Sequence, residues 1–273
     1  MVKKLFKHEF LSYARVMGIV YGVLLTLAAA NRIIQIFESD SIAYNIVFTI
    51  SAITYGVSIF LALAFSGILC IIRFYKNLFT AEGYLTFTLP VTPTQHIFVK
   101  VVTAVCVEMV TLIVVMLSGC VICAGDMLAE IWKAGAYIYR LVFEEIGIHT
   151  ILVSCEMLLI FLLALFASFL MYYTFISIGQ LFKKNRILAA IGAYFVYYIL
   201  MQILSTILMV CVSLASVAGA FDNLAIWFAE MAEKNPLGIL HLGMGAMAVI
   251  MIIGIVIEFF VTKVIITRKL NLE

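Results

Sequence analysis

Residues 150–182 read TILVSCEMLLIFLLALFASFLMYYTFISIGQLF and carry a single charged side chain, that of Glu156. A helix needs roughly 20 apolar residues to cross the hydrocarbon core of a bilayer, and this run is longer than that. Its apolar residues are continuous rather than alternating, which excludes the strands of a transmembrane barrel. The stretch therefore predicts a membrane-spanning helix.

Five further runs have the same apolar character, at residues 16–37, 45–72, 97–124, 187–218 and 237–266. Of the 273 residues, 66% are hydrophobic and only 12% are charged, which is half of the roughly 25% found in a soluble domain. Lipid offers no partner for backbone polar groups, so only helices or closed barrels span it. We expect an all-α polytopic membrane protein, with six transmembrane helices in one transmembrane domain over residues 1–273.

Lysine and arginine predict the orientation, because cytoplasmic loops hold the excess of these residues. Thirteen fall on one side of the predicted spans: Lys3, Lys4, Lys7, Arg15, Arg73, Lys76, Lys100, Lys183, Lys184, Arg186, Lys263, Arg268 and Lys269. Four fall on the other: Arg32, Lys133, Arg140 and Lys234. Both termini are therefore expected in the cytoplasm, and the loops at residues 125–149 and 219–236 are expected outside the cell.

Residues 1–15 form a basic amphipathic segment before the first span. Apolar residues recur there at helical spacing, while Lys3, Lys4 and Lys7 occupy the other face. Such a helix lies in the plane of the membrane interface, with its lysines near anionic head groups. We expect an interfacial helix here, and the alternative is a charged tail that only sets the topology.

The connection at residues 73–97 is the least lipid-like stretch predicted to face the cytoplasm. Residues 73–100 read RFYKNLFTAEGYLTFTLPVTPTQHIFVK, which holds more aromatic residues than a plain connector needs. Exposed aromatic residues beside charges indicate a protein contact, whereas aromatic anchors at the membrane interface are the alternative. The residues alone leave both interpretations open.

Three carboxylates fall inside predicted spans, where a charged group costs roughly 2.5–3.5 kcal/mol on insertion scales. Glu108 shares a helical face with Thr111, and Glu156 has His149 two turns before it on the same side. Glu108, Thr111 and Glu156 are candidates for a polar transport path, with hydrogen bonding between helices as the alternative. Glu258 lies near Lys263 and is expected to snorkel to the interface.

Catalytic and metal-binding motifs are missing from the sequence. There is no G-x-x-x-x-G-K-[ST] phosphate loop and no H-E-x-x-H, so we expect neither ATP hydrolysis nor another catalytic activity in this chain. Cys120 and Cys123 form a C-x-x-C without the second ligand pair that a zinc site requires. Neither a metal, a cofactor nor a nucleic-acid partner is expected.

Residues 74–100 carry a more specific signal. Glu82-Gly83-Tyr84-Leu85 and Thr88-Leu89-Pro90-Val91-Thr92 resemble the E-G-Y-L…T-L-P-V-[ST] run of small Firmicute permeases of the type-2 ABC exporter family. The order of a basic N-terminal helix, six spans, a cytoplasmic second loop and a helical outer loop before the last span is similar to that family over the whole chain.

The resemblance implies a permease subunit in a bacterial cell membrane, paired with a second copy or a paralogue and with cytoplasmic ABC ATPase subunits. In the family the second loop holds a coupling helix that sits in a groove of the ATPase, and the N-terminal helix moves with it. The implied coupling residues are Tyr75, Phe79, Glu82, Gly83, Tyr84, Leu85, Phe87 and Pro90. Family members export peptides, drugs or lipids, and several confer resistance to antimicrobial peptides.

Two other classes of function remain open on the residues. One is a secondary transporter driven by ions, with Glu108 or Glu156 as its proton site. The other is a membrane sensor or immunity protein that transports nothing and binds its target through the outer loops. Co-purification of a soluble ATPase separates the permease from both.

Overall fold

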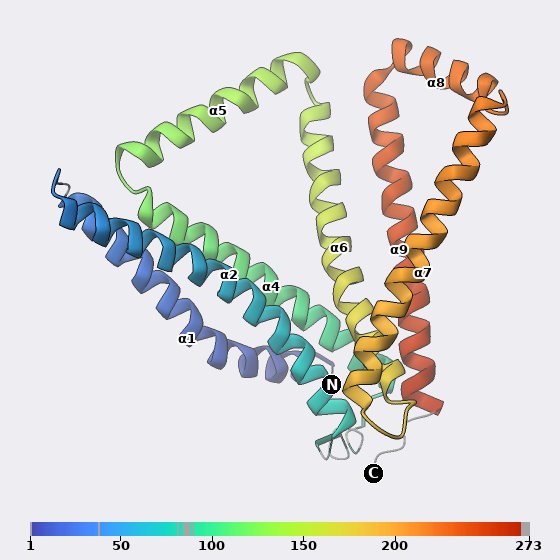
Figure 1. The fold of residues 1–273 in the computed structure, drawn as a ribbon, viewed down its shortest axis with the longest axis horizontal. Coiled ribbons are helices and arrows are strands. Elements are labelled where there is room, and N and C mark those ends of the chain that lie inside the picture. Colours follow the sequence, from blue (N-terminus) through green and yellow to red (C-terminus); the bar gives the residue numbers. More distant parts are fainter. Residues whose placement is uncertain (1, 38, 81, 84–87, 89, 269–273) are drawn as a thin grey trace. The chain divides into compact units, whose positions relative to one another are not determined.

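The computed structural model describes residues 2–37, 39–80, 82–83, 88 and 90–268 (Figure 1). Those residues form eight α-helices and no strand, so the all-α prediction is confirmed. Six helices are long and apolar enough to cross a membrane, as predicted for a multi-pass membrane protein. They are α1 (Val2–Ile36), α2 (Ile42–Phe79), α4 (Pro93–Ile122), α6 (His149–Gly179), α7 (Arg186–Val217) and α9 (Pro236–Arg268). The other two are α5 (Asp126–Ile146) and α8 (Asp222–Lys234).

The chain divides into two compact units, which we call the N-terminal unit (Met1–Gly147) and the C-terminal unit (Ile148–Glu273). In the N-terminal unit, α1, α2 and α4 pack against one another as a three-helix bundle (Figure 1). Its fully buried side chains come from all three helices and are mostly apolar. They include Met17, Leu24, Phe74, Leu78 and Ile97.

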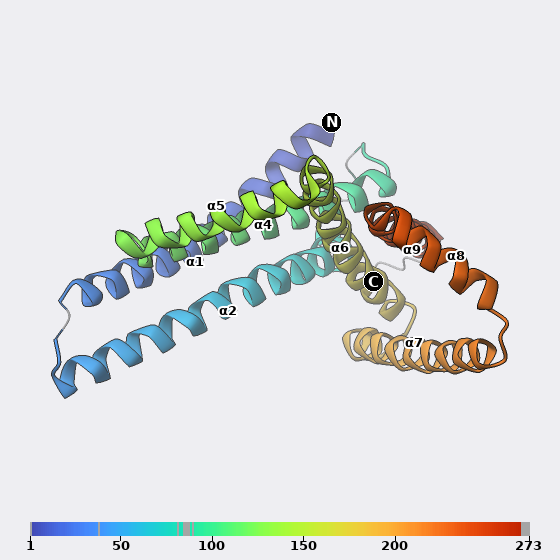
Figure 2. The same ribbon diagram turned by 90° about the horizontal axis from the view of Figure 1, so that it is seen from above.

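In the C-terminal unit, α6 packs along α9 and also against α7, while α8 runs from the end of α7 to the start of α9 (Figure 2). The turn between α6 and α7 brings their backbones close together. A Cβ atom on Gly179 would lie 2.6 Å from both the Cβ of Ala190 and the carbonyl oxygen of Arg186. Glycine at this position therefore permits the close approach of the two helices.

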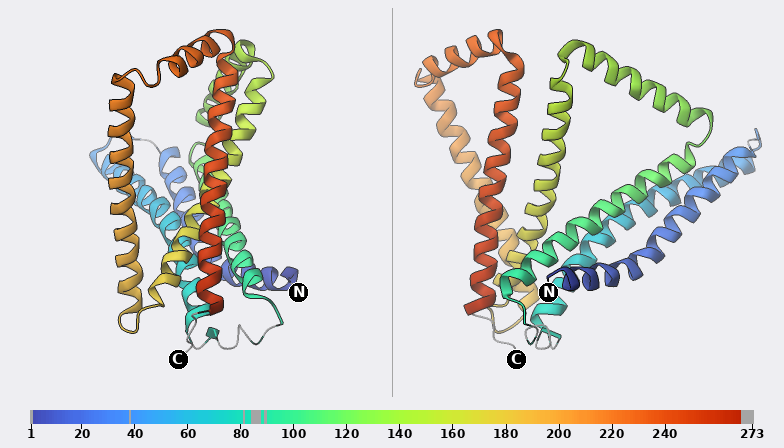
Figure 3. Two further views of the ribbon diagram at one scale, coloured as in Figure 1. Left: turned by 90° about the vertical axis from the view of Figure 1, so that its right-hand side faces the viewer. Right: turned by 180° about the vertical axis from the view of Figure 1, so that it is seen from behind.

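The predicted interfacial segment and the first span form one continuous helix, α1. Its first turns lie at an angle to the rest of the helix (Figure 3). Glu9, Tyr13 and Met17 of these turns are buried in the N-terminal unit, so this part of α1 has one face packed on protein. Its position at the membrane interface stays a prediction.

The connection predicted at residues 73–97 is shorter in the structure. Helix α2 continues to Phe79, because Phe74, Leu78 and Phe79 bury their side chains against the bundle. Helix α4 starts at Pro93 behind a capping box, in which Thr92 accepts from the backbone N–H of Gln95 and the Gln95 side chain accepts from that of Thr92. Proline is well suited to the first helical position, where its missing N–H would have no partner. The connection between the two helices therefore shrinks to residues 80–92.

The predicted outer loops contain the helices α5 and α8. Gly125 and Gly147 border α5 with φ angles of 102° and 59°, values that glycine adopts without steric cost. The 21-residue α5 is exposed along nearly its whole length and carries apolar residues such as Trp132 beside charged ones. It packs on no other helix to the extent that α1, α2 and α4 pack on one another.

Candidate functional site

A buried polar cluster joins α1 to α2 and α4, the two helices that flank residues 80–92. Lys100 of α4 donates from Nζ to the Glu9 carboxylate of α1 at 2.8 Å, with side-chain exposures of only 3% and 12%. Asn77 of α2 donates to the same carboxylate oxygen at 3.2 Å. Because one carboxylate receives both donors, α1, α2 and α4 meet at a single point.

A second contact between α1 and α2 extends this cluster. Arg73 donates from one guanidinium nitrogen to the Ser12 hydroxyl and from another to the Ser12 carbonyl oxygen at 3.0 Å. The guanidinium also lies over the ring of Tyr13, 4.5 Å from its centroid. We call the set Glu9, Ser12, Tyr13, Arg73, Asn77 and Lys100 the junction network.

The structure describes five of the eight residues implied as coupling residues. Tyr84, Leu85 and Phe87 lie outside the described residues. Pro90 and Glu82 are exposed, and Glu82 is near enough to Lys100 for an electrostatic interaction.

The remaining coupling residues lie at the end of α2 or just after it. Phe79 is 7% exposed, and its ring stands edge-on to Phe74 at 5.8 Å. Tyr75 is half-buried beside Phe79. The backbone N–H of Gly83 donates to the Thr80 carbonyl oxygen at 2.8 Å, which begins a turn directly after α2.

The polar face of α4 is used for contacts between helices. The Thr111 hydroxyl donates to the Val107 carbonyl, so the hydroxyl of Tyr21 on α1 donates to Thr111 at 2.7 Å. By the same argument, Tyr55 of α2 donates to Ser118 at 2.8 Å. These bonds give the polar stripe of α4 a role in holding the bundle together.

Glu108 has a different environment from Thr111 because it keeps part of its surface exposed. Ser66 of α2 lies 2.7 Å from Glu108 Oε2 and donates to it. Ser66 itself is fully buried, so a buried hydroxyl holds the carboxylate of a residue that stays partly exposed. Among the residues suggested for a transport path in this unit, Glu108 is the one with an exposed portion.

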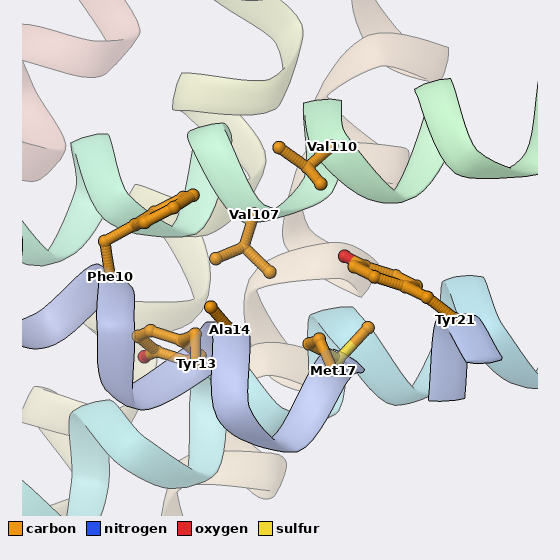
Figure 4. A pocket seen from close by; sticks show the side chains of 7 residues that line it. All are labelled: Phe10, Tyr13, Ala14, Met17, Tyr21, Val107 and Val110. Atoms are coloured by element: carbon orange, nitrogen blue, oxygen red, sulfur yellow. The ribbon is translucent and has the colours of Figure 1, made fainter. Parts of the chain in front are cut away.

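A small apolar pocket of about 180 Å³ lies between α1 and α4 (Figure 4). Its lining includes Tyr21, whose hydroxyl bonds to Thr111, and Tyr13 of the junction network. The complete lining is Phe10, Tyr13, Ala14, Met17, Tyr21, Val107 and Val110. The pocket therefore extends from the junction network toward the polar face of α4.

Glu156 belongs to a second polar cluster, in the C-terminal unit. Its carboxylate lies 2.8 and 2.9 Å from Nδ1 of His241, and Nε2 of His241 lies 2.9 Å from Nδ1 of His149. His149 and Glu156 are on α6, and His241 is on α9. The structure thus adds His241 as a partner that the sequence had not singled out.

The expected snorkelling of Glu258 to the interface stays a prediction, but one of its carboxylate oxygens is turned into the protein. Glu258 is half-buried, and its Oε2 atom is buried without a hydrogen-bond partner in the described part of the chain. Lys263 instead has its ammonium group 5.8 Å from the centroid of the Phe260 ring. The expectation relied on closeness in sequence, whereas the rotation of α9 turns one carboxylate oxygen inward.

Among the described residues, no group of three or more His, Cys, Asp or Glu side chains could hold a metal ion. The six cysteines, including Cys120 and Cys123, have free thiols.

The sequence interpretation nominated neither His241 nor any member of the junction network, including its carboxylate Glu9, as a site residue. Glu9 is a lone acid among Lys3, Lys4, Lys7 and His8, and His241 is a single histidine within the apolar run at residues 237–266. For His241, the signal that could have found it is the rarity of such groups inside spans, where each needs a partner. Glu9 gives no such signal, because it lies in the predicted interfacial segment, where charged residues are ordinary. Comparison of the chain with models of protein families, with curated proteins and with solved structures found no match in any of the three.

Proposed function

We propose that this chain is the membrane-spanning permease subunit of a multi-subunit bacterial ABC exporter. A separate cytoplasmic ATPase hydrolyses ATP, and this chain, paired with a second copy or a paralogue, uses that energy to export a peptide, a drug or a lipid-like substrate. Antimicrobial peptides belong to this substrate range. The proposal includes a cell-membrane location with both termini in the cytoplasm and an interfacial first part of α1.

The observation that carries the proposal is the junction network. It ties α1, α2 and α4 together next to residues 80–92, which hold the E-G-Y-L…T-L-P-V-[ST] run. A protein that pushes on this segment would move three helices at once, because Lys100 of α4 and Asn77 of α2 both bond to the Glu9 carboxylate of α1. Interiors are closely packed and transmit such displacements.

The surface of the segment also favours a protein partner. Glu82 and Pro90 are exposed, and the sequence places three further apolar or aromatic residues between them, Tyr84, Leu85 and Phe87. Interfaces are enriched in aromatic residues, and a few of these usually carry most of the binding energy. A carboxylate beside them matches a basic groove.

The test is purification of the affinity-tagged full chain from native membranes, followed by identification of any ATPase that accompanies it. We expect a subunit with a phosphate-binding loop, and we expect Glu82→Lys to reduce its recovery at least about tenfold. Glu233→Lys is the matched control, because Glu233 is equally exposed but lies in α8. Absence of an ATPase from the wild-type preparation, or equal recovery with Glu82→Lys, would remove the proposal.

A further inference from the structure

Three titratable side chains form a line in the C-terminal unit: Glu156, His241 and His149. The distances are 2.8 Å between Glu156 Oε2 and His241 Nδ1, and 2.9 Å between His241 Nε2 and His149 Nδ1. Both ring nitrogens of His241 are therefore engaged, one with a carboxylate and one with a second imidazole. The exposures of the His241 and Glu156 side chains are 20% and 34%, so the protein covers most of both side chains.

The hydrogen positions follow from these contacts. Two ring nitrogens 2.9 Å apart hold one hydrogen between them, because two facing N–H groups would repel and two bare nitrogens would not bond. If His149 Nδ1 carries this hydrogen, His241 Nε2 accepts it and His241 Nδ1–H donates to the carboxylate. If His241 Nε2 carries it, His149 Nδ1 is the acceptor.

We propose that Glu156, His241 and His149 form a proton relay, which binds a proton at Nε2 of His149 and delivers it to the carboxylate of Glu156. The hydrogen on His149 Nδ1 moves to His241 Nε2, and the hydrogen on His241 Nδ1 moves to Glu156. Both imidazoles end neutral in their other tautomer, and Glu156 ends as a neutral carboxylic acid. One proton enters and none is lost, and the reverse sequence releases it.

The relay has a definite direction along α6. His149 is the first residue of that helix, and Glu156 lies seven residues further on, which is about 10 Å at 1.5 Å per residue. The apolar run of α6 makes a charged carboxylate at that depth costly. A relay that reaches from the helix end to this carboxylate allows Glu156 to exchange its charge without direct contact with bulk water.

The opposite end of the same helix pair shows that α6 and α9 do not need titratable groups to hold together. There, the hydroxyls of Thr174 and Thr262 lie 2.8 Å apart and are both buried. Hydroxyl groups provide that contact without a change of charge. The choice of two imidazoles and a carboxylate at the other end adds the capacity to carry a proton, which histidine has at physiological pH.

The charged and titratable groups of the neighbouring helices are not members of the relay. Helix α8, which packs on α9, carries Asp222, Glu230, Glu233 and Lys234, all exposed, and Glu230 pairs with Lys234 at 3.5 Å. Helix α7, which packs on α6, carries Tyr194 and Tyr197 in contact with Phe175 near the opposite end of α6. Its remaining titratable groups are Arg186, Tyr198 and Cys211.

The relay can be tested on the full chain in lipid nanodiscs, without ATPase or nucleotide, so the result is independent of the proposed function. Infrared difference spectra are recorded after a jump from about pH 8 to about pH 5, which spans histidine titration. We expect a carboxylic-acid C=O band that Glu156→Gln abolishes. His241→Gln and His149→Gln should slow its rise roughly 100-fold, the lower end of what a positioned proton donor contributes. His8→Gln, at an exposed position of α1, should leave the rate unchanged.

The relay is overturned if no band depends on Glu156, or if that band rises at the wild-type rate in both histidine variants. Nitrogen NMR of the wild-type rings provides a second measurement that needs no variant to fold. It should find one protonated and one bare nitrogen between His149 and His241, joined by a hydrogen-bond coupling. Protons on both facing nitrogens, or on neither, would equally exclude the relay.

Discussion

Lys100 and Glu9 lie 91 residues apart in the sequence and form a buried ion pair at 2.8 Å between α4 and α1. Lys100 counts as a surface charge when the sequence is used to assign topology. In the structure it is only 3% exposed, and it lies eight residues after the connection at residues 80–92. The pair ties the first turns of α1 to those of α4.

Replacement of Lys100 by methionine should destabilise the N-terminal unit by about 3–5 kcal/mol, the usual cost of leaving one member of a buried ion pair unpaired. Asn77 would remain as a hydrogen-bond donor to Glu9 but would not balance its charge. The free energy of unfolding in detergent micelles, measured by denaturant titration, checks the size of the effect.

Two controls sharpen this measurement. The double variant Glu9→Leu with Lys100→Met removes both charges and should be near wild-type stability or above it, because two apolar residues avoid the desolvation cost. Lys234→Met breaks the exposed pair with Glu230, whose side chains are 77% and 60% accessible, and should cost no more than about 0.5 kcal/mol. Equal losses of unfolding free energy for Lys100→Met and Lys234→Met would show that the buried pair stabilises the protein no more than the exposed pair.

The parts of the fold that depend on local chemistry were predictable. Six apolar runs give six long helices because backbone groups in lipid must bond within their own helix. The start of α4 was also encoded, since Thr92, Pro93 and Gln95 form a capping box with proline at the first helical position. The sequence interpretation missed this signal and extended the loop to residue 97. The end of α2 was harder, because Phe74 and Phe79 continue the helix through tertiary packing.

The candidate sites were predictable only in part. Glu108 and Glu156 stand out because an ionisable residue in an apolar run is rare. Their partners Ser66 and His241 depend on the rotation of two helices and on which helices pack together, and neither follows from one sequence. Glu9 was not singled out either, because its charge looks ordinary beside Lys7.

Thr111→Val should lower stability by about 0.6 kcal/mol and by no more than about 1.7 kcal/mol, the average and the largest value measured for hydrogen bonds between membrane helices. The change removes the acceptor of Tyr21 in a fully buried position and keeps the shape of the side chain. Thr49→Val is the control, because Thr49 is exposed and its hydroxyl bonds to the Asn45 carbonyl of its own helix. A loss of stability for Thr49→Val as large as for Thr111→Val would contradict the assigned role.

Glu258→Met should raise stability by about 1–3 kcal/mol, because it removes a buried carboxylate oxygen that lacks a hydrogen bond in the described part of the chain. Glu258→Gln keeps a polar group in the same place and should gain less. Thermal unfolding of the purified chain in one detergent compares the three proteins. A fall in stability with methionine would mean that the Glu258 carboxylate makes a stabilising contact in the folded protein.

Cysteine labelling tests the orientation of the spans in intact cells. In a background without the six native cysteines, Lys76→Cys and Lys183→Cys should be protected from an impermeant thiol reagent, whereas Glu130→Cys and Glu233→Cys should react. All four positions are exposed in the structure, so burial within the chain would not explain protection. Reaction of position 183 from outside would overturn the predicted topology, which follows from the bias of lysine and arginine.

Arg73→Lys tests whether the junction network depends on geometry or only on charge. The guanidinium of Arg73 gives two hydrogen bonds to Ser12 and lies over the Tyr13 ring, an arrangement that a single ammonium group cannot reproduce. We expect the variant to lose about 2 kcal/mol of stability, since a hydrogen bond from a charged group contributes roughly 1.5–3 kcal/mol. Arg140→Lys, at an exposed position of α5, should leave the stability unchanged. If Arg73→Lys were equally silent in the same unfolding assay, the charge alone would be sufficient and α1 would be held to α2 mainly by apolar packing.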